Sequence, residues 1–303
     1  MSADARQPRK RPFPLALLAL PLLVVAACAP ADEGAEMGAS GAMAISSVPT
    51  PPPAEEGALA ALNASPRHGE WVDIPLPGST TPVRTWAVYP ERADDAPVVI
   101  VTMEIYGLTD WIRSVADQFA AEGFIALAPD LLSGMGPGGG GTAAMADRDA
   151  AVAAVRTLAP DETMRRVDAV RAYAMTIPSA TGEVGIVGFC WGGGTSFSYA
   201  IHQAGLGAAV VYYGSSPAED AAYDRVAGAV LGLYGGDDQR VNATIPRAQE
   251  AMSRLGKSYE VEIYEGAGHG FLRAQAAQEG ANMRATNQAW PRTVNFFREH
   301  LGS

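Results

Sequence analysis

Apolar and polar positions fall into distinct blocks from Trp71 to the end of the chain. Short continuous apolar runs, such as Pro97–Thr102, are typical of strands buried on both faces of a sheet. Longer stretches with apolar residues three or four positions apart, such as Leu108–Glu122, predict helices that pack one face on that sheet. The predicted strands are Trp71–Leu76, Val83–Tyr89, Pro97–Thr102, Phe124–Ala128, Val184–Phe189, Ala208–Tyr213, Ala229–Tyr234 and Tyr259–Tyr264, and the predicted helices are Leu108–Glu122, Asp161–Met175, 192–204, 244–255 and 288–301.

The order of these elements predicts the fold class. Strands alternate with helices, which favours an α/β architecture with a mostly parallel central sheet and helices on both of its faces. No repeat with a period of roughly 20–50 residues is present, so the chain is not a solenoid. We expect a single folded domain over residues 67–303.

Residues 1–27 have the pattern of a signal peptide. A basic start precedes the apolar run Phe13–Ala27, as in secretory signals. This run is shorter than the ~20 residues that cross a bilayer, and Pro14 and Pro21 interrupt it. An uncleaved membrane anchor is the alternative interpretation.

The end of the run, Val25-Ala26-Ala27-Cys28, resembles the lipobox of bacterial lipoproteins. That resemblance implies that Cys28 is lipidated and that the chain is exported and lipid-anchored in the bacterial cell envelope, facing the periplasm or the outer surface. Residues 28–66 are rich in Pro, Ala and Gly without an apolar period, which predicts a flexible tether between the anchor and the folded domain.

Composition and charge exclude several classes of function. The chain is 48% hydrophobic and carries a net charge of −11. An acidic chain is poorly suited to nucleic acid, whose binding depends on basic surface. Two cysteines and four histidines are too few for a disulfide scaffold or a Cys-rich zinc site. If Cys28 is lipidated, Cys190 stays a free thiol.

The strongest chemical motif is Val187–Gly194, in which Cys190 has a glycine two positions before it and another two positions after it. It follows a predicted strand and opens a predicted helix, as the nucleophile elbow G-x-S-x-G does, with cysteine in the serine position. Glycines let the backbone pass closely at such a turn. The amides of the helix N-terminus favour both a thiolate and an oxyanion. A buried structural cysteine and a nucleotide-binding loop are the alternatives.

Two further loops follow predicted strands and add an acid and a base. Asp238 ends the run Gly235–Asp238, which alone could be an ordinary acidic turn, and His269 lies between two glycines. The order Cys190, Asp238, His269 is the nucleophile–acid–base order of α/β-hydrolases. Glu104 follows the strand Pro97–Thr102, where a carboxylate is either a capping group or a catalytic one.

At these motifs the chain resembles the dienelactone hydrolase family, from about Trp71 to His300. The resemblance lies in E-I-Y-G at Glu104–Gly107, A-P-D-L at Ala128–Leu131, G-F-C-W-G-G at Gly188–Gly193, G-G-D-D at Gly235–Asp238 and G-A-G-H-G-F at Gly266–Phe271. It implies the α/β-hydrolase fold in a single domain.

The resemblance also implies roles for the residues of these motifs. Cys190 is the nucleophile, His269 the base and Asp238 the acid that orients it. Glu104 contacts the resting thiol and takes part in its activation when substrate arrives. The expected reaction is hydrolysis of a small-molecule ester or lactone through a thioester acyl-enzyme, without a metal or organic cofactor.

The family pattern further implies an oxyanion hole and a substrate-binding residue. The hole is formed by the backbone N–H groups of Ile105 and Trp191. Arg273, four residues after His269, corresponds to an arginine that binds a substrate carboxylate, and Arg148 is the nearest candidate for a second one. Two alternatives stay open: a thioesterase or other acyl hydrolase with the same triad, and a non-catalytic lipoprotein that uses the fold as a binding module.

Overall fold

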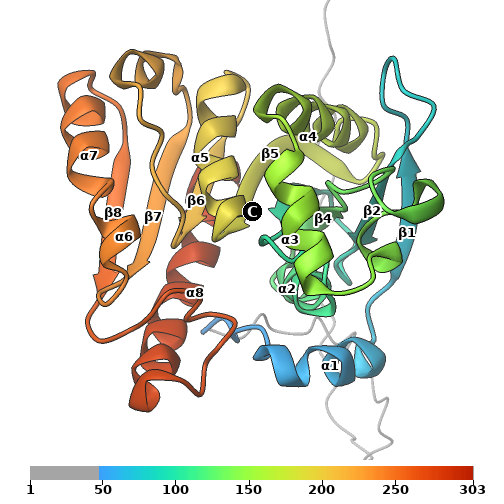
Figure 1. The fold of residues 1–303 in the computed structure, drawn as a ribbon, viewed down its shortest axis with the longest axis horizontal. Helices are drawn as coiled ribbons and strands as arrows, with labels where there is room; N and C mark the ends of the chain where they lie inside the picture. The colour runs from blue at the N-terminus through green and yellow to red at the C-terminus, as the bar shows by residue number, and fades with distance from the viewer. Residues whose placement is uncertain (1–47, 303) are drawn as a thin grey trace, which may run out of the picture. The chain divides into compact units, whose positions relative to one another are not determined.

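The computed structural model describes residues 48–302, which lie within one compact unit. One eight-stranded sheet has the strand order β1-β2-β4-β3-β5-β6-β7-β8 (Figure 1). The first two pairs, β1–β2 and β2–β4, are antiparallel, and every later pair is parallel. The strands are β1 (Gly69–Ile74), β2 (Val83–Val88), β3 (Ala96–Thr102), β4 (Ile125–Pro129), β5 (Ala180–Phe189), β6 (Ala208–Tyr212), β7 (Ala229–Gly235) and β8 (Tyr259–Tyr264). The predicted α/β class, with its mostly parallel sheet, is confirmed.

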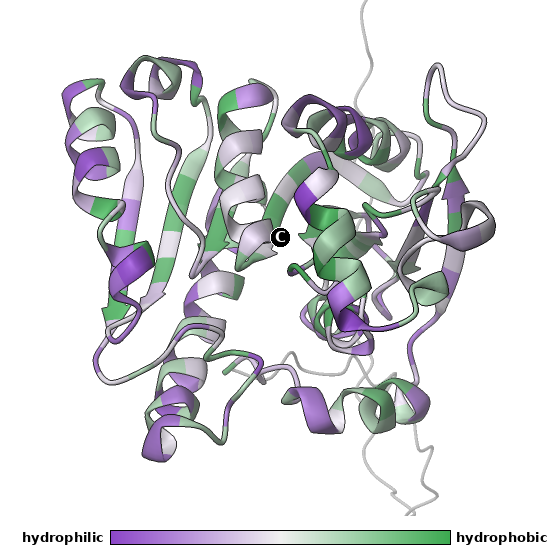
Figure 2. Ribbon diagram, viewed as in Figure 1, coloured by the Kyte–Doolittle hydropathy of each residue, from purple (hydrophilic) through white to green (hydrophobic). Residues whose placement is uncertain are grey.

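Burial along the strands follows their hydrophobic pattern. Every residue of β3, β4, β6 and β7 is buried, because these strands have helices on both sides and apolar side chains on both faces. The edge strands β1 and β8 instead mix exposed and partly buried positions. Figure 2 shows the same contrast, with hydrophobic colour concentrated in the central strands.

The helices form two layers. On one face, Phe119 of α2 (Asp110–Ala121) contacts Trp290 and Phe297 of α8 (Ala281–Leu301). On the other face, α4 (Pro160–Ala174) contacts α5 (Trp191–His202), and α7 (Ile245–Arg254) packs beside them through the 3₁₀ helix η4 (Asp220–Arg225). Over residues 48–302, no helix has both the length and the apolar character needed to cross a bilayer.

All predicted strands and helices occur, most of them within a few residues of the expected bounds. The helix predicted at 288–301 is longer, because α8 begins at Ala281. Two α-helices of seven or more residues were not predicted. One is α3 (Arg148–Thr157), which Asp147 caps by accepting a hydrogen bond from the Ala150 amide at 2.8 Å. The other is α1 (Ala58–Ala64). The shorter helical elements are η1 (Glu55–Gly57), η2 (Pro137–Gly139), η3 (Thr142–Ala144), α6 (Gln239–Asn242) and η5 (Gln278–Gly280).

The expected tether over residues 28–66 differs from the structure in its second part. From residue 48 onward the chain packs on the domain, with α1 against α2. The Pro52 carbonyl accepts a hydrogen bond from Gln275 Nε2 at 2.9 Å, and the Pro53 carbonyl accepts one from Trp111 Nε1 at 3.1 Å. Proline lacks an N–H but keeps this acceptor. The folded domain therefore includes residues 48–66, while residues 28–47 and the expected signal peptide with Cys28 lie outside the described residues.

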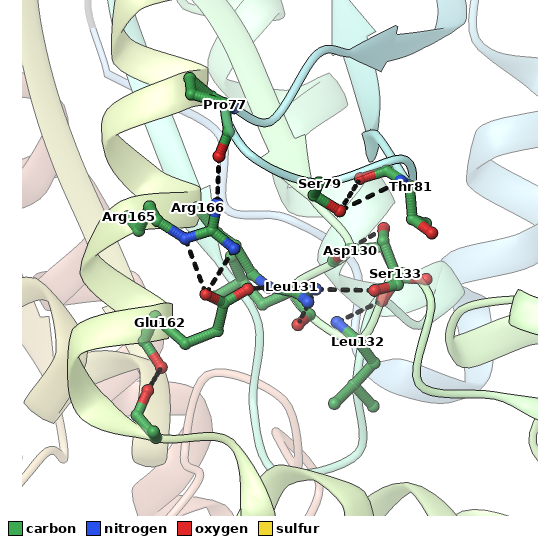
Figure 3. Close-up of polar contacts among 12 residues, drawn as sticks. Pro77, Ser79, Thr81, Asp130, Leu131, Leu132, Ser133, Glu162, Arg165 and Arg166 are labelled. Carbon is green, nitrogen blue, oxygen red and sulfur yellow. Dashed lines mark hydrogen bonds and ion pairs between the residues drawn. The ribbon is translucent and has the colours of Figure 1, made fainter.

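A buried arginine holds the loop that follows β4. Arg166 of α4 donates from Nη1 to the carbonyl oxygens of Leu131 at 3.0 Å and Ser133 at 2.8 Å, while its Nε pairs with Glu162 at 2.7 Å (Figure 3). These bonds satisfy backbone carbonyl groups at the carboxyl end of the sheet. They anchor the start of the glycine-rich stretch 134–141 to α4.

Candidate active site

Cys190 lies on the turn between β5 and α5, in a backbone conformation that is rare for a residue with a side chain. Its φ is 56° and its ψ is −116°. The turn is held by a hydrogen bond from the Cys190 amide to the Tyr212 carbonyl at 3.0 Å. A Cβ at Gly188 would lie 1.9 Å from the Gly192 carbonyl oxygen, so only glycine fits where the turn closes on itself. The expected elbow geometry is therefore present.

Opposing electrostatic effects act on the Cys190 thiol. Burial and the negative charge of Glu104 raise its pKa, whereas the backbone amides of Trp191 and Ile105 and the cation of Arg240 lower it. The first two effects are larger, and the pKa rises to about 11. The thiol is therefore protonated at neutral pH, and a thiolate forms only when a base removes the proton.

The turn after β3 orients the Ile105 amide. The Gly107 amide donates to the Glu104 carbonyl at 3.1 Å, and Gly107 has a left-handed φ of 81°. Thr142 braces the turn, because its hydroxyl accepts a hydrogen bond from the Leu108 amide at 3.0 Å. Thus the two amides that act on the thiol come from two separate strand ends.

Asp238 and His269 form a side-chain pair at the ends of β7 and β8. Asp238 Oδ2 lies 2.5 Å from His269 Nδ1, and Asp238 is only 7% exposed. The loop that carries the histidine is held by a hydrogen bond from the Gly268 amide to Asn282 Oδ1 at 2.9 Å. With Nδ1 engaged by the carboxylate, Nε2 is the ring nitrogen suited to proton transfer. The structure therefore brings together the acid and base candidates from the sequence.

Glu104 is buried beside Arg273. Its Oε2 accepts a hydrogen bond from Arg273 Nε at 2.7 Å. Burial raises the pKa of the Glu104 carboxyl, and Arg273 and the Tyr213 hydroxyl offset part of that rise. Glu104 acts on Cys190 through its charge, and its contact with the resting thiol stays a prediction.

The two candidate substrate-binding arginines lie together, but a carboxylate of the chain itself lies between them. Arg273 Nη1 donates to Glu55 Oε2 at 2.7 Å, and Arg148 forms an ion pair with the other oxygen of Glu55. The guanidinium carbons of Arg148 and Arg273 lie 4.7 and 5.5 Å from the Tyr106 ring centroid. The two arginines lie close together, and their role in substrate binding stays a prediction. Glu55, from the supposed tether, was not anticipated.

Sequence reasoning also missed Tyr213, which directly follows β6. Its buried ring contacts His269 edge-on at 5.1 Å between centroids, and its hydroxyl is close enough to Glu104 to lower the pKa of that carboxyl. Tyr213 also lines the cavity beside Cys190. Its place at the carboxyl end of a buried parallel strand is the signal that could have identified it.

A cavity of about 990 Å³ opens beside Cys190 between α4, α5 and the stretch 215–225. This volume is within the range of small-molecule sites. Ile105, Trp191 and Tyr213 line it near the thiol. The remaining lining mixes apolar residues, such as Leu158, Met164, Ile201 and Ala222, with polar and charged ones, such as Asp161, His202, Glu219, Arg225 and Arg240. The cavity can therefore accept a substrate with an apolar chain.

The functional groups of this site are those of its side chains and backbone. Within residues 48–302, no group of three or more His, Cys, Asp or Glu side chains is arranged to hold a metal ion. The site combines a thiol, an imidazole, carboxylates and guanidinium groups with two directed backbone amides. That set is suited to acyl transfer.

Comparisons with known proteins agree with this geometry. The model of the dienelactone hydrolase family matches residues 83–301. A Methylorubrum extorquens protein assigned as a carboxymethylenebutenolidase is 32% identical over 249 residues, which cover 76% of this chain and 80% of that protein. An Escherichia coli protein with the same assignment is 29% identical, covering 77% of this chain and 87% of its own length.

Solved structures agree as well. A Klebsiella pneumoniae protein assigned as a dienelactone hydrolase superposes with a TM-score of 0.68 at 26% identity, covering 77% of this chain and 99% of that one. A promiscuous phosphotriesterase described as dienelactone hydrolase-like, from metagenomic libraries, has a TM-score of 0.66 at 25% identity and covers 78% of this chain and 99% of its own. The chain therefore belongs to the dienelactone hydrolase family, whose members have the α/β-hydrolase fold.

Proposed function

We propose that this hydrolase cleaves small ester or lactone substrates, with Cys190 as the nucleophile and a thioester acyl-enzyme as the intermediate. The observation that carries the proposal is the setting of Cys190, a thiol on a strained elbow with the amides of Ile105 and Trp191 acting on it. Donors in that position can stabilise an oxyanion as soon as the sulfur attacks a carbonyl carbon.

The raised pKa of the thiol determines how the reaction must begin. Because Cys190 keeps its proton at neutral pH, a base has to take that proton as sulfur attacks. His269 serves as this base, and Asp238 holds its ring and stabilises the imidazolium that forms. The charge of Glu104 keeps the proton on sulfur until then. A thiol that is neutral at rest is also less readily oxidised than a thiolate.

The remaining steps return the enzyme to its starting state. The tetrahedral intermediate collapses, the C–O bond to the leaving alcohol breaks, and the imidazolium of His269 gives that alcohol its proton. Water, deprotonated by His269, then attacks the thioester, and the departing sulfur of Cys190 regains a proton as the acid product leaves. Amides are poor substrates for this scheme, because a thiolate leaves the intermediate more readily than an amine does.

Turnover by the full chain tests the proposal, with wild type beside Cys190→Ala and the exposed-residue control Glu56→Gln. The panel contains an activated aryl ester, a dienelactone, a thioester and an aryl phosphotriester, the last because of the phosphotriesterase neighbour. We expect ester or lactone turnover in wild type and Glu56→Gln and none in Cys190→Ala. Turnover that survives Cys190→Ala would contradict the nucleophile assignment.

The preferred substrate separates the alternatives. A strong preference for the thioester would identify a thioesterase with the same residues, and no turnover on any member would favour a binding module. Mass spectrometry after a short incubation checks the intermediate, because the acyl-enzyme adds the mass of the acyl group. The adduct should be detected in wild type quenched during turnover. It should be missing from Cys190→Ala, which lacks the nucleophile, and from His269→Ala, which lacks the base that acylation needs.

A further inference from the structure

Four charged side chains form a chain of contacts that starts next to Cys190. Glu104, whose charge raises the pKa of the thiol, pairs with Arg273, Arg273 pairs with Glu55, and Glu55 pairs with Arg148. We call these four residues the charge cluster. It begins within electrostatic range of the nucleophile and ends at Arg148, whose side chain is 54% exposed.

The charge cluster contains a formed carboxylate site. Two guanidinium groups face the ring of Tyr106 and contact the two oxygens of one carboxylate, that of Glu55. Arginine is the side chain best suited to bind carboxylates, because its planar donor fork matches their geometry. With two acids and two arginines the cluster is formally neutral, so without Glu55 it would carry one positive charge.

Glu55 is held in this site by its own segment. Its amide donates to the Arg273 carbonyl at 3.1 Å. The preceding prolines, Pro52 and Pro53, accept hydrogen bonds from Gln275 and Trp111, and α1 follows directly and packs on α2. A carboxylate from solution must compete with one whose effective concentration is on the order of millimolar or higher. Glu55 is therefore a resident occupant of the site.

We propose that Glu55 is a specificity-determining residue that fills the carboxylate site of Arg148 and Arg273, so that the enzyme favours esters whose acyl chain is uncharged. The inference rests on the proposed ester hydrolysis. The substrate's acyl chain then extends into the cavity beside Cys190, where Met164 and Ile201 lie. Glu55 blocks its access to Arg148 and Arg273. Removing the Glu55 carboxylate opens the site to a substrate carboxylate.

A matched pair of esters measures this preference. One is para-nitrophenyl hexanoate, and the other is the mono-para-nitrophenyl ester of adipic acid, whose acyl chain has the same length but ends in a carboxylate. The ratio of kcat/KM for the charged ester to that for the neutral ester is compared among wild type, Glu55→Ala, Glu55→Gln and Glu56→Ala. Arg225 and Arg240, which also line the cavity, are present in every protein, so their contribution cancels when the ratio of a variant is divided by that of wild type.

We expect the ratio to rise about tenfold to a hundredfold in Glu55→Ala, the typical range for hydrogen bonds to a charged partner. Glu55→Gln keeps the side-chain volume and should show a smaller rise, while Glu56→Ala, which alters an exposed neighbour, should match wild type. An unchanged ratio in a folded Glu55→Ala, checked by circular dichroism, would overturn the proposal. A wild type that already prefers the charged ester would also overturn it.

A binding measurement separates failure of this inference from failure of the proposed function. Acetate that binds the opened site should raise the Tm of Glu55→Ala, with a stabilisation that grows with the logarithm of the acetate concentration above its Kd. It should shift wild type and Glu56→Ala much less. If no ester is hydrolysed but acetate stabilises Glu55→Ala selectively, the proposed function fails and the carboxylate site stands. Equal acetate shifts in all three proteins would overturn the site assignment.

Discussion

Two regions near Cys190 differ in what they offer a substrate. The first, which we call the apolar side, is an open cavity of about 990 Å³ with apolar residues such as Met164 and Ile201 in its lining. The second, the charged side, is the charge cluster, in which every charged group contacts another charged group of the chain. The charged groups of the cluster are therefore already paired with one another, whereas the cavity presents apolar surface that a substrate can cover.

The physical chemistry of the two sides explains this division. Apolar surface in the cavity lining gains roughly 25 cal/mol for each Å² that a substrate covers. The charge cluster gains nothing comparable, because a substrate carboxylate would have to displace Glu55 and leave that acid without its two partners. Glu55 and Arg273 are mostly shielded from solvent, with side chains 26% and 20% exposed, so the loss of these contacts is only partly offset by hydration.

The largest effect is expected from Asp238→Asn, which alters neither side directly. Losing the carboxylate that orients His269 should lower kcat by about 10³–10⁴, with little change in KM. The exposed neighbour Asp237→Asn is the matched control and should stay near wild type. Steady-state kinetics on para-nitrophenyl hexanoate checks both. A full loss in Asp237→Asn with activity in Asp238→Asn would reverse the acid assignment.

Gly188→Ala should show how strictly the elbow constrains Cys190. The added Cβ would lie 1.9 Å from the Gly192 carbonyl oxygen, so the backbone must shift, at a cost of roughly 3 kcal/mol or more of unfolding free energy. In Gly194→Ala the nearest atom is 3.3 Å away, and the change should be far smaller. Urea unfolding measures both variants. Equal stabilities of the two variants would contradict the close packing of the backbone at Gly188.

Substitutions on the two sides sharpen the comparison directly. Met164→Asp places a charge in the cavity lining and should lower kcat/KM for para-nitrophenyl hexanoate about tenfold, because the apolar chain loses a contact and meets a charge. Arg148→Gln alters the exposed end of the charge cluster and should change the same constant by less than about threefold. If Arg148→Gln lowered kcat/KM more than Met164→Asp does, the hexanoyl chain would have to bind at the charged side.

The smallest expected effect is on the reactivity of the Cys190 thiol, which is measured without substrate. The negative charge of Glu104 raises the pKa of Cys190, so Glu104→Gln should lower that pKa and increase the thiolate fraction at pH 8. Arg273 keeps its ion pair with Glu55 but loses that with Glu104, so its positive charge acts in the same direction. Alkylation by iodoacetamide at pH 8 should become about threefold faster or more, since thiolate is the reacting form. Glu56→Gln is the control, and identical rates would contradict the electrostatic coupling.

The elbow and the sheet could be predicted because their causes are local. Continuous apolar runs such as Pro97–Thr102 indicate strands covered on both faces, and β3 is indeed buried along its whole length. Glycines around Cys190 reflect close backbone contacts that occur within a few residues, as at Gly188. Parallel strands have their carboxyl ends at one edge of the sheet, so Cys190, Asp238 and His269, each of which follows such a strand, were expected to lie near one another.

The segment from residue 48 to residue 66 could not be predicted in the same way. Its prolines and small residues are typical of a tether, yet Pro52 is buried and its carbonyl accepts a hydrogen bond from Gln275, 223 positions away. The Ala- and Leu-rich stretch after Glu56 has high helix propensity, which was the available signal for α1. Only the folded structure shows that α1 packs against α2.

The sequence by itself determined the α/β class, the elbow and the candidate triad, because periodicity, glycine spacing and strand order are local or follow from the topology of a parallel sheet. The tertiary structure decided the state of the arginines. Glu55 and Arg273 are 218 positions apart, and no periodic pattern records which acid a distant guanidinium will meet. Charge pairing depends on three-dimensional distance and burial, so only the folded chain shows that Glu55 occupies the site of Arg148 and Arg273.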